Sequence, residues 1–161
     1  MNVAYLILGG NLGDRIKNIS LAENLLHKSG IKISSSSAVY QTAPWRMQNC
    51  PDFYNKVLKV ETLFNPEALL KVCLDVEVDF GRIRRADAYL SREMDVDILF
   101  YENLILNTPL LSLPHPKLHL RKFVLIPLNE ISPDLIHPVF NKSIRQLLSQ
   151  CEDNLRVTKV E

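Results

Sequence analysis

The amino-acid sequence predicts a single α+β domain built around a mainly antiparallel sheet. Apolar runs of strand length alternate with two segments of helical periodicity, in the order strand, helix, strand, strand, helix, strand. The chain has 161 residues, which suits one domain covering residues 1–161. Apolar residues make up 47% of it, enough for a core, and the longest apolar run, Val3–Leu8, is too short to cross a membrane.

A glycine-rich turn separates the first strand from the first helix. Val3–Leu8 is typical of a buried strand, and residues 9–14 (Gly-Gly-Asn-Leu-Gly-Asp) interrupt it. Asp14 is placed to cap a helix that continues to about Lys28 and ends at Gly30. The turn lacks the lysine of a P-loop, so a purely structural role and a ligand-facing role both remain open.

Two strands and a second helix follow. Ile31–Gln41 and Asn55–Leu63 alternate like strands. Asn65 followed by Pro66 is typical of a helix start, and this helix should end before Gly81.

A last core strand and several short elements complete the chain. Asp95–Tyr101 reads as a strand. We expect the remaining elements to be a short strand at Leu104–Leu106, an irregular proline-rich stretch at Pro109–Pro116, a short apolar element at Phe123–Pro127 and a final helix capped by Asn141 or Ser143. The order matches the ferredoxin-like βαββαβ sandwich, with helices packed on one face of the sheet. That fold serves many functions, so function must be argued from particular residues.

Two acidic residues lie on the same side of the last core strand. Strand side chains alternate between faces, so Asp95 and Asp97 point to one side. Val96, Ile98 and Phe100 point to the other, where the helices should pack. Neighbouring carboxylates repel unless a cation joins them, and hard oxygen ligands suit Mg²⁺. Alone, the pair could equally be a solvated edge of the sheet.

A basic segment precedes the acidic pair. Arg82, Arg84, Arg85 and Arg92 stand against a single acid in the loop, Asp87. Carboxylates that hold a metal, together with convergent arginines, are typical of phosphoryl-transfer sites. The overall net charge is only +1, which argues against a general nucleic-acid coat and favours a small anionic ligand.

The cysteines and the N-terminus indicate a cytoplasmic protein. Cys50, Cys73 and Cys151 are odd in number and far apart, which suits a reducing compartment better than a disulfide framework. The start of the sequence has no basic region before its apolar run, so we expect no secretion signal.

Short motifs in a fixed order resemble a known family over nearly the whole chain. They are Gly9-Gly10-Asn11-Leu12-Gly13-Asp14-Arg15, Tyr40-Gln41-Thr42-Ala43-Pro44, Pro51-Asp52-Phe53-Tyr54-Asn55, Glu77 with Gly81-Arg82-Ile83-Arg84, Arg92-x-x-Asp95-Val96-Asp97-Ile98-Leu99, Pro114-His115-Pro116, and Arg121-Lys122-Phe123-Val124-Leu125-x-Pro127-Leu128. In these motifs the sequence resembles the 6-hydroxymethyl-7,8-dihydropterin pyrophosphokinases of folate biosynthesis. The resemblance implies a ferredoxin-like monomer that transfers diphosphate from ATP to the pterin hydroxymethyl group and releases AMP. It implies no nucleic-acid or membrane partner.

The resemblance also implies a role for each site residue. Asp95 and Asp97 would hold two Mg²⁺ ions, and Arg82 and Arg92 would join them in catalysis. The expected ATP-binding residues are Glu77, Arg82, Arg84, Arg92, Ile98, Ser112, His115 and Arg121. The expected pterin-binding residues are Gly9, Thr42, Pro44, Trp45, Phe53, Asn55, Asp95 and Phe123. From the residues alone, Phe53 and Phe123 could also be core, and His115 a structural loop histidine.

Mobile catalytic loops are part of the same expectation. Residues 44–51, which include Trp45, and the segment before Arg92 would close over the substrates. The second segment departs from the family pattern at Ala88, Leu90 and Ser91, while Tyr89 stands where the family usually has tryptophan.

Two other functions are consistent with parts of the sequence. A nucleotidyltransferase with an Asp-x-Asp metal site would release pyrophosphate instead of AMP. A non-catalytic ferredoxin-like module for RNA or metabolites should present a basic sheet face, whereas the predicted face carries two acids.

Overall fold

The computed structural model describes residues 1–44, 50–80 and 93–160 of the chain. The predicted site residues Trp45, Arg82, Arg84, Tyr89 and Arg92 lie outside these ranges, as does most of each segment that was predicted to close over the substrates. Every other residue predicted for the site lies within them.

The predicted βαββαβ order is confirmed, with the second predicted strand divided into two. Its elements are β1 (Asn2–Gly10), α1 (Arg15–Lys28), β2 (Lys32–Ser36), β3 (Tyr40–Thr42), β4 (Phe53–Thr62), α2 (Pro66–Asp79) and β5 (Asp95–Tyr101). In the described part of the chain, the strands of the main sheet run in the order β5-β1-β4-β3-β8, where β8 is Val157–Lys159. Strand β2 also pairs with β4, and every pair is antiparallel. The long strands β1 and β4 therefore form the centre of the sheet, and β5 lies at an edge.

The helix starts follow their capping residues. The Asp14 carboxylate accepts a hydrogen bond from the Lys17 backbone N–H, and Asn65 does the same for Ala68. Gly30 has a φ of 94°, a left-handed conformation that glycine adopts without strain after a helix.

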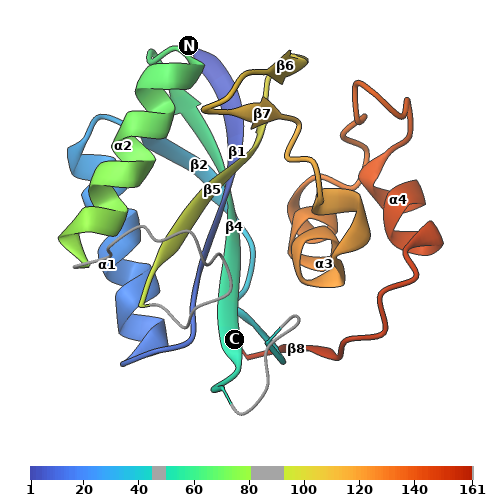
Figure 1. Cartoon of the computed structure of the whole chain (residues 1–161), viewed down its shortest axis with the longest axis horizontal. Coiled ribbons are helices and arrows are strands. Elements are labelled where there is room, and N and C mark those ends of the chain that lie inside the picture. Colours follow the sequence, from blue (N-terminus) through green and yellow to red (C-terminus); the bar gives the residue numbers. More distant parts are fainter. Residues whose placement is uncertain (45–49, 81–92, 161) are drawn as a thin grey trace.

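The sheet has a hydrophobic layer on each face, and Figure 1 shows it standing between two pairs of helices. On one face α1 and α2 pack against a core that includes Leu6, Leu8 and Leu58. On the other, α3 (Lys122–Ile131) and α4 (Ile144–Gln150) pack against Tyr5, Ile7 and Val57. The expectation of helices on one face holds for the core pair α1 and α2, and the C-terminal pair adds a second layer.

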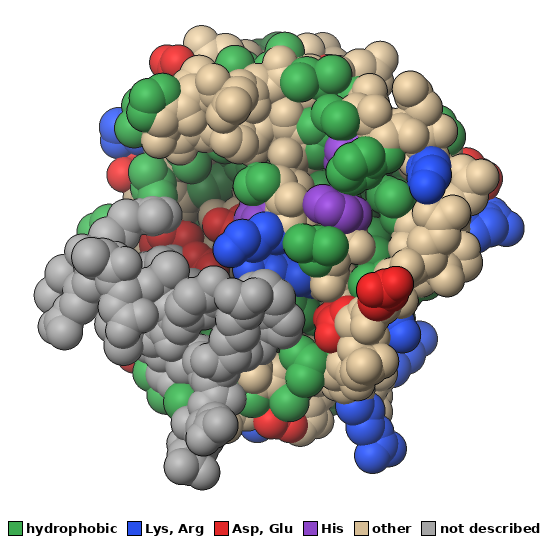
Figure 2. All heavy atoms as spheres, turned by 45° about the vertical axis from the view of Figure 1, so that its right-hand side comes forward, with side chains coloured by type: hydrophobic (Ala, Val, Ile, Leu, Met, Phe, Trp, Pro, Cys, Tyr) green, Lys and Arg blue, Asp and Glu red, His purple; other side chains and the backbone are tan. Residues whose placement is uncertain are grey.

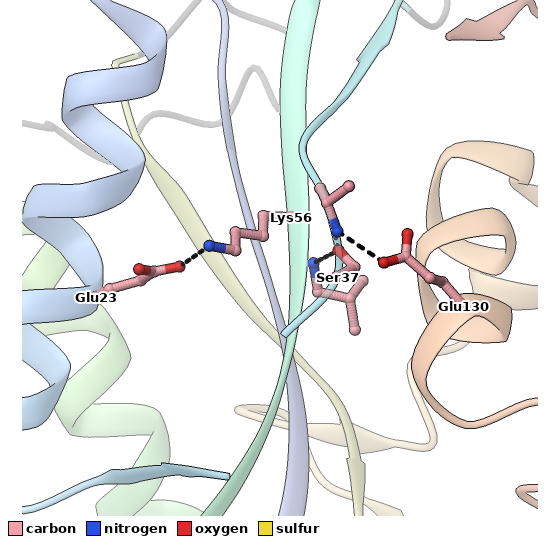
Figure 3. A network of polar contacts seen from close by, with 6 residues as sticks. Glu23, Ser37, Lys56 and Glu130 are labelled. Atoms are coloured by element: carbon pink, nitrogen blue, oxygen red, sulfur yellow. Dashed lines mark hydrogen bonds and ion pairs between the residues drawn. The ribbon is translucent and has the colours of Figure 1, made fainter. Parts of the chain in front are cut away.

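A polar clamp joins α3 to the sheet. The Glu130 carboxylate accepts hydrogen bonds from the Ala38 backbone N–H at 3.0 Å and from the Tyr40 hydroxyl. Figure 3 shows Glu130 reaching from α3 toward the chain beside Ser37, while Lys56 pairs with Glu23 of α1 on the opposite face. Both faces of the sheet are thus tied to their helices by polar contacts as well as by apolar packing.

The expected position of Phe100 is wrong. The pairing of β1 with β5 shifts by one residue between Tyr5 and Leu6, so Leu99 is the extra residue of a β-bulge. Beyond the bulge the alternation is reversed, and Phe100 packs on the α3 face with its ring edge against Tyr5. Val96 and Ile98 precede the bulge and face α1 and α2 as predicted.

Several short elements also differ from the prediction. Ile31–Gln41 is two strands, because Ser37 turns inward and its hydroxyl accepts the Val57 backbone N–H. The expected apolar element Phe123–Pro127 is the first half of the ten-residue helix α3, which contains Pro127 in its interior. The short strand β6 (Leu106–Asn107) stands where a strand at Leu104–Leu106 was predicted, and β7 (Ser112–Leu113) lies within the stretch Pro109–Pro116 that was expected to be irregular. The strand β8 near the end of the chain was not predicted.

The C-terminal helix is capped by Ser143, one of the two predicted residues. The Ser143 hydroxyl accepts the Gln146 backbone N–H, and the Gln146 side chain accepts the Ser143 backbone N–H, which is a complete capping box. Among the described helices, none combines the length and the apolar character needed to span a membrane.

Candidate functional site

The site is organised by one row of residues across the end of the sheet. Asp95 of β5 pairs with Gly9 of β1, Gly9 pairs with Asn55 of β4, and Asn55 pairs with Tyr40 of β3. Residues paired across strands share a face of the sheet. Since Ile7, two residues before Gly9, packs on the α3 face, the whole row faces that side.

Gly9 leaves room for the side chain of Asn55. A Cβ atom on Gly9 would stand 2.0 Å from Asn55 Oδ1 and 3.1 Å from Asn55 Cγ. The Asn55 carboxamide therefore leans across β1 in the direction of β5, and its residue is buried, with 6% of its surface exposed. This contact gives the first glycine of the glycine-rich motif a steric reason, which the sequence alone leaves open.

Three carboxylates meet at the edge of the sheet. Glu77 of α2, Asp95 and Asp97 each offer an oxygen atom within 4.8 Å of the others. Glu77 is only 2% exposed, and its Oε2 accepts the backbone N–H of Val96 at 2.9 Å. Asp95 and Asp97 share one side of β5, as the strand alternation predicted.

The family resemblance assigns Glu77 to the nucleotide and does not place it with the two aspartates. One feature of the sequence could have indicated that Glu77 is buried near the sheet: it follows Cys73 by one helical turn, on the inward-facing stripe of α2. A carboxylate on a buried stripe needs a partner. Here the open edge of β5 supplies a backbone N–H, which brings Glu77 to the aspartates.

The cluster concentrates negative charge. Burial raises the pKa of the Cys73 thiol, and the charges of Asp97 and Glu77 raise it further. Cys73 is fully buried and stays a neutral thiol, so it is not a nucleophile.

His115 and Arg121 lie beside the acidic cluster. The His115 backbone N–H donates to the carbonyl oxygen of Leu99, the bulge residue, at 2.9 Å. Burial lowers the pKa of His115 to about 4, the Arg121 charge lowers it too, and Asp95 acts in the opposite direction. His115 is therefore neutral at pH 7 and lies close enough to Arg121 and Asp95 to interact with both. Figure 2 shows acidic, histidine and basic side chains side by side on this face.

The tautomer of His115 follows from its neighbours. His115 Nδ1 accepts the Lys117 backbone N–H at 3.2 Å. In a neutral ring the proton then resides on Nε2, which makes Nε2 a hydrogen-bond donor.

The predicted pterin residues surround the Gly9–Asn55 contact. Phe53 pairs with Thr42 and is half-buried, two residues before Asn55 on the same face of β4. The Thr42 hydroxyl oxygen is buried and has no hydrogen-bond partner among the described residues. Phe123 is in the first turn of α3, with the Arg121 guanidinium carbon 5.6 Å from its ring centroid.

The two remaining residues predicted to bind ATP, Ile98 and Ser112, have side chains that are engaged in other contacts. The Ile98 side chain is in the core between the sheet and the α1–α2 layer. Ser112 is in β7, and its hydroxyl donates to Asn107 Oδ1 at 3.2 Å. Pro44, the last residue before the first undescribed stretch, is half-buried.

Fold and site together define the class of protein. It is a ferredoxin-like α+β domain whose sheet edge carries a carboxylate cluster of the kind that binds hard cations, flanked by a neutral histidine and an arginine. Residues 5–133 match the sequence family of 7,8-dihydro-6-hydroxymethylpterin-pyrophosphokinase (HPPK). The chain belongs to this family.

One relative of similar length and one much longer relative support the assignment. The chain is 40% identical over 146 residues to the 2-amino-4-hydroxy-6-hydroxymethyldihydropteridine pyrophosphokinase of Aquifex aeolicus, covering 91% of this chain and 90% of the relative. It is 38% identical over 149 residues to the folic acid synthesis protein fol1 of Schizosaccharomyces pombe, covering 92% of this chain and 20% of that protein. The chain thus spans about a fifth of the length of such larger relatives.

Solved structures confirm the fold. The crystal structure of HPPK-DHPS in complex with substrates superposes with a TM-score of 0.74 at 18% identity, over 92% of this chain and 43% of that one. Plasmodium falciparum HPPK-DHPS with SDX-DHP gives a TM-score of 0.70 at 20% identity, over 93% and 43%.

Proposed function

We propose that this chain transfers the terminal diphosphate of ATP to the hydroxymethyl group of 6-hydroxymethyl-7,8-dihydropterin and releases AMP, as a step of folate biosynthesis. The observation that carries the proposal is the pairing of Asp95, Gly9 and Asn55 in one row. It sets a carboxylate cluster beside a buried carboxamide, which is what a reaction between a metal-bound phosphate and a heteroaromatic alcohol requires. The proposed unit is one domain, acting as a monomer in the cytoplasm.

The acidic cluster fits magnesium. Carboxylate oxygens within 4.8 Å of one another are compatible with a shared hard cation. We assign two Mg²⁺ ions to Asp95 and Asp97, with Glu77 holding the strand edge between them through the Val96 N–H. Bound magnesium would neutralise phosphate charge and align the reacting oxygens.

The ATP phosphates belong beside His115 and Arg121. The neutral His115 ring would donate from Nε2 to a phosphate oxygen, because Nδ1 is occupied by the Lys117 N–H. Arg121 would add a charged donor whose planar fork suits phosphate oxygens. Arg82, Arg84 and Arg92 are assigned to the same phosphates from the sequence, and Ser112 to the nucleotide.

The nucleotide base belongs along the outer edge of β5. Ile98 faces the core with its side chain, so its contact would come from the backbone. The Val96 N–H already points away from β1 to reach Glu77, and Ile98 follows at the next position of the same orientation.

The pterin belongs between Phe53 and Phe123, with its polar edge on Asn55. A flat heteroaromatic ring gains from stacking against aromatic faces. The Asn55 carboxamide offers both donors and an acceptor, and the buried Thr42 hydroxyl offers a further group. Leaving such a group unpaired costs about 1–3 kcal/mol, so these residues favour a ligand that pairs with them.

The reaction requires the protein mainly to position the two substrates. The pterin hydroxyl oxygen forms a bond to the β-phosphorus while the bond from that phosphorus to the AMP oxygen breaks. The side chains above would hold the two groups in line and neutralise charge. No covalent enzyme intermediate is needed, and the high pKa of Cys73 is consistent with that.

The test measures AMP and pyrophosphate from Mg²⁺-ATP, with and without the pterin, for the native chain and for Asp97→Asn. Asp134→Asn serves as the matched control, since Asp134 is 87% exposed and pairs only with Arg145 in the described structure. We expect pterin-dependent AMP that EDTA abolishes, that Asp97→Asn lowers by at least about 100-fold, and that Asp134→Asn leaves unchanged. Pyrophosphate in place of AMP would instead support a nucleotidyltransferase, and no product from the folded native chain would refute catalysis.

A further inference from the structure

The turn after β1 and the start of α1 form hydrogen bonds to the backbone just before β4, the strand that carries the proposed pterin contacts. Asn11 is 1% exposed, and its Nδ2 donates to the Pro51 carbonyl oxygen at 3.1 Å. The Arg15 guanidinium donates to the Asp52 carbonyl oxygen at 2.8 Å. The same guanidinium lies over the Tyr54 ring, 3.9 Å from its centroid.

A fourth contact comes from β3. The Gln41 carboxamide donates to the Asp52 carboxylate at 2.9 Å. Backbone and side-chain groups of residues 51, 52 and 54 are therefore all held, and Phe53 lies among them. These contacts hold a short segment that contains Phe53 and directly precedes Asn55, the two side chains proposed to bind the pterin.

Arg15 lies on the face of the sheet that α1 and α2 cover. Tyr54 packs against the core of the α1–α2 layer, so the Arg15 guanidinium is on that side. Phe53 and Asn55 alternate with Tyr54 and point to the opposite face, toward the proposed pterin. Arg15 is therefore on the side of the sheet opposite to the proposed pterin.

We propose that Arg15, with Asn11, is a positioning residue that sets Phe53 and Asn55 for the pterin. The inference deepens the proposed function and rests on it. Both residues belong to the glycine-rich motif, Gly9 to Arg15, which therefore has two structural roles. Gly9 leaves space for the Asn55 side chain. Asn11 and Arg15 hold the backbone that leads into Asn55.

The arginine side chain is suited to this task. Its planar guanidinium can stack on an aromatic ring while an N–H at its rim donates to a carbonyl oxygen. Lysine can supply the positive charge and N–H donors but no planar surface. Arg15→Lys should therefore retain part of the effect that Arg15→Ala removes.

The test separates pterin binding from ATP binding and from stability. Calorimetric titration gives the Kd for the pterin with saturating Mg²⁺ and a non-hydrolysable ATP analogue, and separately the Kd for the analogue. We expect Arg15→Ala to weaken pterin binding about ten-fold and Arg15→Lys by less, with the analogue Kd unchanged, because small displacements of binding groups cost this much or more. Arg145→Ala, which removes an exposed arginine from an ion pair with Asp134, is the control for general stability effects.

The outcomes are distinguishable. A native chain that binds the analogue but no pterin refutes the proposed function, and the inference fails with it. A native chain that binds pterin, with Arg15→Ala binding equally well, overturns the inference alone. Equal weakening of both ligands in Arg15→Ala also overturns it, since that indicates a merely structural role. If Arg15→Ala does not fold, Arg15→Lys carries the same comparison.

Discussion

A methyl group on Gly9 should displace the Asn55 carboxamide and with it the pterin. The new Cβ would lie 2.0 Å from Asn55 Oδ1, 3.1 Å from its Cγ and 3.4 Å from the Tyr54 carbonyl oxygen. Relieving the closest contact requires a shift of about 1 Å in a close-packed region. Asn55 is 6% exposed, so the side chain cannot simply swing into solvent.

The magnitude follows from this overpacking. Forcing extra volume into a packed site costs about 1–3 kcal/mol of folding free energy. An ångström of misplacement at a binding group costs up to about 100-fold in activity. We therefore expect Gly9→Ala to fold with a lowered Tm and to lose most pterin-dependent AMP formation, while binding of Mg²⁺ with the ATP analogue persists.

A double-mutant cycle isolates the cause. If the clash with Asn55 is the cause, Asn55→Ala removes it, and Gly9→Ala should then cost little additional stability in the Asn55→Ala background. Gly30→Ala is the matched control: at φ 94° it strains the backbone, but its Cβ would meet no atom within 4 Å. Additive stability losses in the cycle, or unchanged pterin affinity in Gly9→Ala, would refute the reasoning.

Two further predictions concern the second layer of the sheet. Burial, and secondarily His119, lower the pKa of His137 to about 4, so between about pH 6.5 and pH 4 the unfolded chain binds more protons. The free energy of unfolding should therefore fall as the pH is lowered through this window, and urea denaturation at pH 7 and pH 5 should show a smaller fall in His137→Asn; equal falls would contradict the assignment. Glu130→Gln and Tyr40→Phe should each destabilise the domain by about 1–3 kcal/mol, because Glu130 accepts from both Tyr40 and the Ala38 N–H. The two changes together should cost less than their sum in thermal unfolding, and additivity would show that Tyr40 and Glu130 do not act as a pair.

Features set by local chemistry could be predicted from the sequence. Asp14 and Asn65 cap helices because their short side chains reach the N–H groups of the first turn, whatever the rest of the fold does. Asp95 and Asp97 share a side because strand alternation needs no partner. These signals sufficed for the βαββαβ order and for the acidic pair.

Features that depend on residues far away in the sequence could not be predicted from it. The bulge at Leu99 depends on the register of β5 against β1, and it moved Phe100 to the opposite face. Helix α3 continues through Pro127 because Val124, Leu125 and Leu128 bury against the second face of the sheet, which outweighs the missing N–H. No pattern within either segment contains this information.

The carboxylate partner of the aspartates shows the same limit. Glu77 is on a helix and the aspartates are on a strand, and only the packing of α2 along the open edge of β5 brings them together. The family motifs associated Glu77 with the nucleotide but gave no distance. Its position became definite only with the backbone N–H of Val96 as its anchor.

The register of β1 decides how far Asn55, the proposed pterin contact, is from the acidic cluster. Asp95 and Asn55 are on strands separated by β1, so their backbones are about 10 Å apart at two strand spacings. The Asn55 carboxamide crosses roughly half of that distance, because Gly9 has no side chain to stop it. A ligand edge paired with Asn55 would then have its next substituents over Asp95. A one-residue slip of β1 that brought Leu8 opposite Asn55 would put a side chain into the space that Gly9 leaves open, so the Asn55 carboxamide could no longer lean toward β5.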